Sequence, residues 1–69
     1  MLRELKSRLD KLAIKYKKWN SQSIILDTDT EVIVEEVDNE LQVTIFDKNM
    51  ICKSFHNVED VISAIKDII

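Results

Sequence analysis

The sequence predicts a single α+β domain, built from an N-terminal amphipathic helix, an antiparallel β-meander and a C-terminal helix. Three observations lead to this fold class. Apolar residues recur at helical spacing near both ends of the chain, and the middle alternates between apolar and polar residues with turn formers between the runs. A chain of 69 residues has the size of one small domain, covering residues 1–69. The simplest arrangement has two layers, with both helices on one face of the sheet.

The first helix is expected to run from near Met1 to Trp19. Its residues are mostly good helix formers, and Lys17 and Lys18 near its end suit the helix dipole. Six apolar or aromatic residues recur at spacings of three and four and would share one stripe: Leu2, Leu5, Leu9, Leu12, Tyr16 and Trp19. The spacing therefore predicts that Tyr16 and Trp19 lie in the core.

Two runs in the middle of the chain form a predicted hairpin. Residues 31–37 are rich in Val and Ile, residues 41–46 alternate strictly, and Asp38-Asn39 separates them. As a two-residue turn, Asp38-Asn39 would pair Val34 with Val43 and place both on the apolar face. The opposite face would keep Glu31, Ile33, Glu35, Gln42, Thr44, Phe46, Met50 and Cys52.

A third strand follows the hairpin. With Asp47-Lys48-Asn49 as a three-residue loop and Asn49 left-handed, Leu41 pairs with Phe55 and the apolar face continues. A two-residue loop is the alternative, and it would turn Phe55 to the other face because a slip of one residue reverses every side chain. The meander has three strands, or four if residues 23–26 also pair.

The C-terminal helix is predicted to begin after Asn57, a favoured N-cap residue. Glu59 and Asp60 then fall in the first turn, where negative charge suits the helix dipole. A wide apolar stripe follows, formed by Val58, Val61, Ile62, Ile65, Ile68 and Ile69.

The composition excludes most of the catalytic and ligand-binding motifs that can be recognised in a sequence. The chain has no Gly and no Pro, so it has no glycine-rich phosphate loop, nucleophile elbow or dinucleotide fingerprint. One Cys and one His leave little for a disulfide or a structural zinc site. We expect a non-enzymatic protein with no catalytic residues, no metal and no cofactor. No apolar run approaches the roughly 18 residues of a membrane span, and the lone Cys fits a cytoplasmic protein without a membrane partner.

Two short patterns partly resemble functional motifs but lack residues that those motifs require. Asp27-Thr28-Asp29-Thr30-Glu31 partly resembles the Asp-x-Asp-x-Thr signature of haloacid-dehalogenase-like phosphatases, but its fifth position is Glu31 and the chain is too short for that domain. Read as a calcium loop, it has Val32 where Gly is required. We expect an acidic turn. Cys52 and His56 are expected to lie apart, Cys52 half-buried and His56 exposed.

Charge is segregated along the chain. Seven Lys and Arg face two acids up to Trp19, whereas three Lys face eleven acids after it. Our main hypothesis is a module that binds another protein through an acidic sheet surface, as an inhibitor or regulator of the small type that phages and mobile elements encode. The binding residues would be Asp27, Asp29, Glu31, Glu35, Glu36 and Asp38.

The alternative is a nucleic-acid-binding protein that uses the basic N-terminal helix. At 100° per residue, one face of that helix would carry Arg8, Lys11, Lys15 and Lys18. A homodimer is also possible. Its contacts would be the apolar stripe of the first helix, which spans under three heptads, and apolar residues on the outer sheet face.

Overall fold

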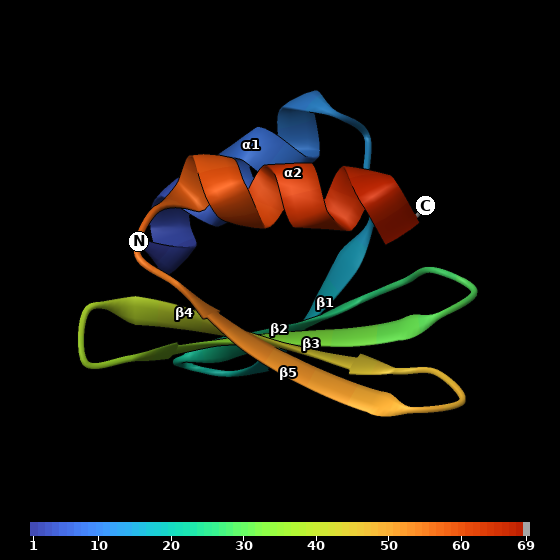
Figure 1. The fold of residues 1–69 in the computed structure, drawn as a ribbon. Coiled ribbons are helices and arrows are strands. Elements are labelled where there is room, and N and C mark those ends of the chain that lie inside the picture. The colour runs from blue at the N-terminus through green and yellow to red at the C-terminus, as the bar shows by residue number, and fades with distance from the viewer. Residues whose placement is uncertain (69) are drawn as a thin grey trace.

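The computed structural model describes residues 1–68 and confirms the α+β class. A helix at each end encloses five consecutive strands (Figure 1). The elements are α1 (Leu2–Lys11), β1 (Tyr16–Asn20), β2 (Ser23–Leu26), β3 (Glu31–Val37), β4 (Glu40–Phe46), β5 (Met50–Phe55) and α2 (Val58–Ile68). The prediction for Ile69 lies outside the described residues.

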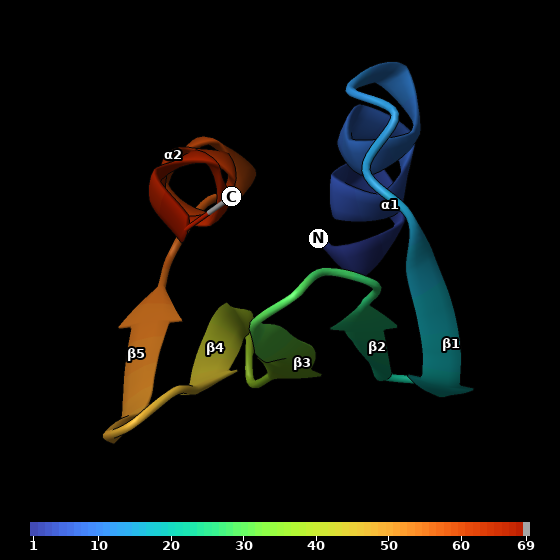
Figure 2. The same cartoon turned by 90° about the vertical axis from the view of Figure 1, so that its right-hand side faces the viewer.

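The five strands form one antiparallel sheet whose spatial order follows the chain, β1-β2-β3-β4-β5. Both helices cover the same face, as predicted: α1 lies above β1 and β2, and α2 above β4 and β5 (Figure 2). No helix in residues 1–68 combines the length and apolar character needed to cross a bilayer. The sheet therefore has one covered face, here called the inner face, and one uncovered face, here called the outer face.

The central hairpin has the predicted register. Asp38 and Asn39 take φ values of 48° and 65°, so both central residues are left-handed, as a two-residue turn between twisted strands requires. Val34 pairs with Val43. Asn and Asp tolerate this conformation better than other non-glycine residues, which explains how a chain without Gly makes a tight hairpin.

The β4–β5 connection also has the predicted length. A three-residue loop pairs Leu41 with Phe55 and Ile45 with Ile51, and keeps them on the inner face. The prediction that Asn49 is left-handed was wrong. Among the non-glycine residues of 1–68, positive φ occurs at Ala13, Asp38 and Asn39, and Asn49 is not one of them. Residues 23–26 do form a strand, β2, which pairs with β3.

The first helix is much shorter than the heptad spacing predicted. It ends at Lys11, and Ala13 turns the chain with a φ of 58°. The N–H of Ile14 donates to the carbonyl of Leu9 at 3.0 Å, which closes the helix end. Residues 16–20 then pair with β2 as a fifth strand. Pairing with β2 satisfies the backbone of this segment and outweighs its moderate helical propensity.

Because the helix is shorter than predicted, Tyr16 and Trp19 lie in β1 and not on the helical stripe. Tyr16 is partly buried against the core, whereas Trp19 is 67% exposed and was wrongly expected in the interior. In β1 successive side chains alternate between faces, so a spacing of three no longer keeps Tyr16 and Trp19 together.

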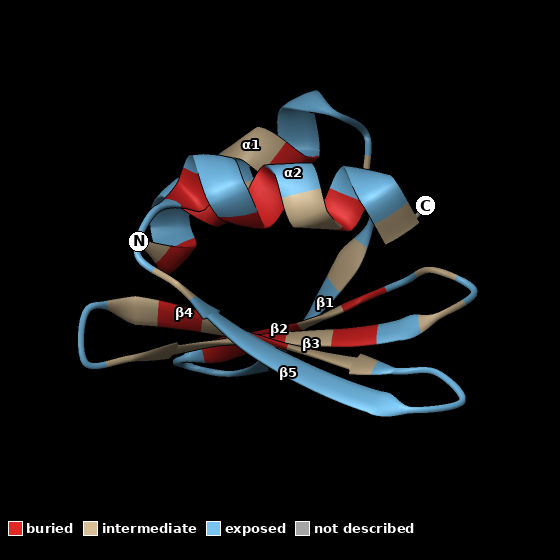
Figure 3. Cartoon of the chain, in the orientation of Figure 1, coloured by how far each residue is buried: buried red, intermediate tan, exposed pale blue. Residues whose placement is uncertain are grey.

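The core lies between the inner face and the two helices. Red buried segments in Figure 3 mark where α1, α2 and the central strands meet. The buried apolar residues are Leu2, Leu5, Leu9, Ile24, Leu26, Val32, Val34, Leu41, Val43, Val58, Val61, Ile62 and Ile65.

The N-cap of α2 is as predicted, because the N–H of Asp60 donates to Asn57 Oδ1 at 2.8 Å.

One row of paired residues crosses the whole inner face. Its three central members are buried and apolar, and its two ends, on the edge strands β1 and β5, are lysines. The row is Lys18, Ile24, Val34, Val43 and Lys53. A lysine that points inward from an edge strand resists the addition of a further strand, because that strand would have to bury the charge.

Candidate functional site

The outer face is an uncovered surface with an apolar centre. The paired residues Lys17, Ile25, Ile33, Thr44 and Cys52 cross it from β1 to β5. Ile25 and Ile33 are partly exposed, and no helix or strand of residues 1–68 lies over them. The Thr44 hydroxyl donates to Cys52 Sγ at 3.6 Å at the β5 end of the row.

Carboxylates and large apolar side chains surround this centre. Glu31 and Glu35 flank Ile33 along β3, on the same face. At one end of the sheet Phe46 and Met50 pair with each other, and they are 41% and 70% exposed. The outer face thus combines an apolar surface with negative charge, and the predicted placement of its residues on β3, β4 and β5 is confirmed.

The six acidic residues predicted to bind a protein do not form one surface. Glu31 and Glu35 lie on the outer face. Asp27 and Asp29 lie in the β2–β3 connection at one end of β3, and Asp38 lies in the turn at its other end. Glu36 faces the helices. Strand alternation explains the split, since consecutive residues such as Glu35 and Glu36 must point to opposite faces.

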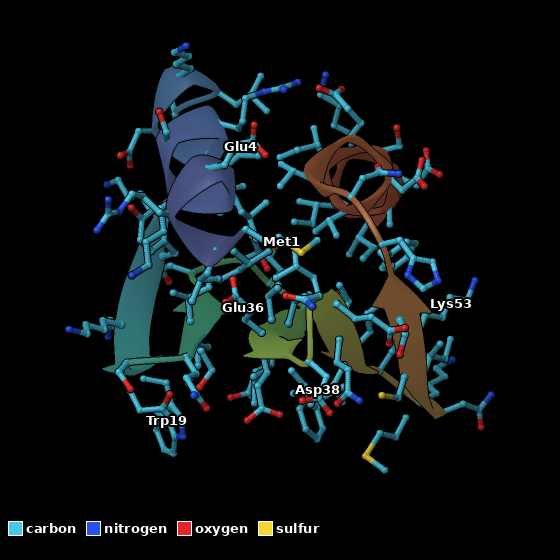
Figure 4. The ribbon with its side chains drawn as sticks, turned by 90° about the vertical axis from the view of Figure 1, so that its left-hand side faces the viewer. Met1, Glu4, Trp19, Glu36, Asp38 and Lys53 are labelled. Carbon is cyan, nitrogen blue, oxygen red and sulfur yellow. The ribbon has the colours of Figure 1, made fainter. Side chains whose placement is uncertain are left out.

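Glu36 has a structural contact on the helix side. Its Oε1 accepts a hydrogen bond of 2.7 Å from the N–H of Leu2 and lies 3.2 Å from the amino terminus of Met1. Figure 4 shows Met1 and Glu36 close together beneath the helices. The hydrogen bond from Leu2 and the adjacent amino group lower the pKa of Glu36 below its ordinary value. Glu36 therefore anchors α1 to the sheet.

The predicted basic helix face does not exist as one surface. The helix ends at Lys11, so Lys15 lies in the following connection and Lys18 in β1. Arg8 instead pairs with Glu59 of α2 through both of its terminal nitrogens, with Nη2 3.1 Å from Oε2. The hydrogen bond to Glu59 and its charge raise the pKa of Arg8, and Arg8 lowers the pKa of Glu59 in the same way.

The reactive residues remain apart. Cys52 is exposed in β5, not half-buried as predicted, and His56 is exposed with Nδ1 3.5 Å from Glu40 Oε1. Within residues 1–68, no three His, Cys, Asp or Glu side chains gather closely enough to hold a metal ion. In the acidic turn before β3, the Thr28 hydroxyl bonds to the Thr30 carbonyl.

A groove of about 190 Å³ lies between α2 and the strands β4 and β5. Its walls are mainly apolar, with Lys53 and Asp67 among them. Sites for drug-sized ligands usually enclose about 300–1,000 Å³. This groove is smaller than that range.

Sequence reasoning missed the part of the outer face contributed by β1 and β2. Ile25 stands between the buried residues Ile24 and Leu26, so strand alternation alone would have placed it on the opposite face. The spacing of apolar residues instead predicts a helix for Lys17 and Trp19. The alternation of apolar or aromatic and basic residues from Ile14 to Lys17 was the available sign of a strand.

Comparisons of the chain with protein-family models, curated proteins and solved structures give no significant match.

Proposed function

We propose that this protein is a non-enzymatic interaction module that binds another protein through the outer face of its sheet, as an inhibitor or regulator of the small type that phages and mobile elements encode. One observation carries the proposal: no helix or strand of residues 1–68 covers the outer face, which combines partly exposed isoleucines with carboxylates. Covering such a centre removes apolar surface from water, which favours association by roughly 25 cal/mol per Å² before the costs of binding.

The charges on this face favour a partner of opposite sign. Two copies packed face to face about an axis through the centre of β3 would bring Glu31 and Glu35 near the same residues of the second copy, and like charges at an interface are costly. A partner with an apolar centre and Lys or Arg around it would complement both features. The basic groove of a nucleic-acid-binding protein has this chemistry.

The test is an affinity capture from host lysate at moderate salt after nuclease treatment, comparing the wild type with Glu31→Lys/Glu35→Lys. We expect the wild type to retain a specific basic protein, and the variant to bind that purified protein about tenfold or more weakly. The matched control is Glu4→Lys/Asp67→Lys, which makes the same change in charge on exposed helical residues. The control should bind like the wild type.

Capture that survives the reversal at Glu31 and Glu35 would exclude the outer face as the binding surface. Equal losses in both variants would show a response to overall charge alone. A dimer that dissociates on the reversal would identify the partner as a second copy, and sedimentation of the purified protein detects it.

A further inference from the structure

We propose a second binding surface on this protein, one that takes single-stranded nucleic acid along the free edge of β1. This surface, here called the cationic edge, differs from the helical face predicted from the sequence because it combines one flank of α1 with an edge strand. Its residues are Arg3, Lys6, Lys15, Lys17, Lys18 and Trp19.

The fold brings the cations of α1 to the edge of the sheet. Arg3 and Lys6 line a surface hollow together with Ser21 of the β1–β2 turn and with Glu36, whose carboxylate pairs with the amino group of Met1. Arg8 faces the other way, toward Glu59 of α2. The flank of α1 that bears Arg3 and Lys6 therefore lies on the β1 side of the molecule, where α1 and β1 are adjacent (Figure 2).

The strand supplies cations on both of its faces. Lys18 pairs with Ile24 and belongs to the inner row, whereas Lys17 pairs with Ile25 on the outer face, and both are exposed. Lys15 immediately precedes the strand. The five lysines and arginines of the cationic edge form no ion pair with residues 1–68. Asp10 and Asp27 line one hollow with Lys15 and Lys17 without pairing with them, so the edge keeps an excess of positive charge for phosphate groups.

Trp19 gives this edge its specificity for bases. It is 67% exposed and projects from β1 on the side away from the helices (Figure 4). Exposed aromatic rings beside a positively charged track are how proteins bind single strands without reading sequence, because any base can stack on the ring. A strand of five residues spans about 17 Å, enough for only a few nucleotides.

The distribution of charge selects a single strand over a duplex. The cationic edge is one strand and one helix flank wide, and Glu31 and Glu35 lie on the adjoining outer face. A duplex would bring phosphates near those carboxylates, whereas a single strand can follow the edge. An acidic protein segment would meet the same lysines but would gain less from an exposed indole.

The test uses Trp19 as its own reporter, since it is the one tryptophan in the sequence. Titration with twelve-nucleotide oligothymidylate at 50 mM salt should quench tryptophan fluorescence through stacking. If three phosphates are contacted, affinity should fall about 20-fold between 50 and 200 mM salt. Anisotropy of the labelled oligonucleotide extends the measurement to variants without tryptophan.

The variants separate stacking from charge. Trp19→Ala should weaken binding about tenfold, and Trp19→Phe should recover most of the loss because it restores an aromatic ring. Lys17→Glu/Lys18→Glu should weaken binding at least tenfold. The matched control Lys48→Glu/Lys66→Glu makes the same change in charge away from β1 and should remain within twofold of the wild type. Circular dichroism verifies folding.

Absence of quenching at 50 mM salt would overturn the proposal, and so would equal losses in the lysine variants and their control. Tighter binding of a glutamate-rich peptide than of the oligonucleotide would assign the edge to an acidic protein. The outer-face variant Glu31→Lys/Glu35→Lys should retain oligonucleotide binding. The protein-binding proposal and the nucleic-acid-binding proposal can therefore be tested independently.

Discussion

The two faces of the sheet use the same strands in different ways. Ile24 is buried beneath the helices, whereas its neighbour Ile25 lies on the uncovered face. Glu36 holds the amino terminus on one side, and Glu35 lies free of that contact on the other. The inner face is apolar except at Glu36 and its two edge lysines, and the outer face mixes isoleucine with glutamate. The inner face thus makes the contacts that hold the fold together, whereas the composition of the outer face is not set by packing against the helices.

The largest expected effect comes from a matched pair of isoleucines. Ile24→Ala should lower the free energy of unfolding by about 2–5 kcal/mol, because it leaves a cavity in a fully buried site. Ile25→Ala should cost only about 1 kcal/mol, since that side chain already contacts water. Urea denaturation followed by circular dichroism measures both. Equal losses would contradict the comparison and indicate that something covers the outer face in solution.

An intermediate effect is expected at the β5 edge, which is exposed along nearly its whole length (Figure 3). Lys53→Val removes the inward-pointing charge and should make the protein self-associate with increasing concentration, through pairing of free edges. Ser54→Val raises strand propensity at the next position and leaves Lys53 in place, so it should remain like the wild type. Sedimentation velocity distinguishes the two. A monomeric Lys53→Val protein would show that other features protect this edge.

The smallest expected effect is a pH dependence at Glu36. Its pKa is lowered from 4.5 in the folded protein, so ionised Glu36 stabilises the fold at higher pH. That stabilisation is lost as the pH falls below about 4.5 and through the folded-state pKa. Glu36→Gln should therefore show a flatter loss of stability on acidification than Glu35→Gln, its neighbour on the outer face. Denaturation midpoints measured between pH 7 and pH 3 test this, and parallel curves would contradict it.

Much of the fold could be predicted because local signals agreed with tertiary packing. Asp38-Asn39 fixed the turn, and alternation around it then determined which side of β3 and β4 is buried. The apolar stripe and the Asn57 cap likewise defined α2. In each case a residue-specific turn or cap reinforced the hydrophobic period.

The N-terminal segment could not be predicted because two patterns overlapped. Leu2, Leu5 and Leu9 are a true helical stripe, and Tyr16 and Trp19 continued its spacing by coincidence. The helix ends with Ala13 in the left-handed region, where the N–H of Ala13 donates to the carbonyl of Asp10 and that of Ile14 to the carbonyl of Leu9. A non-glycine residue in this region costs about 1 kcal/mol, and Gly or Asn is the usual signal for such a helix end. Ala13 carries no such signal, so the end of the helix could not be predicted.

The candidate sites suffered from the same error. With Trp19 placed in a helix core, its exposure beside Lys17 and Lys18 was hidden, and the cationic edge could not be recognised. The acidic cluster was too broad for a second reason. Residues that are close in sequence need not share a surface, because strand alternation sends Glu35 and Glu36 to opposite faces.

The neighbour-to-neighbour strand order has a consequence for chain entropy. Each strand joins the one before it through a connection of two to four residues, so closing each hairpin restricts only a short loop. The contact of Leu2 with Glu36 instead links positions 34 residues apart. Closing a loop of that length costs about 2 kcal/mol more than closing one of four residues. The sheet is therefore assembled from short-range closures, whereas docking the start of α1 on β3 joins positions that are distant in sequence.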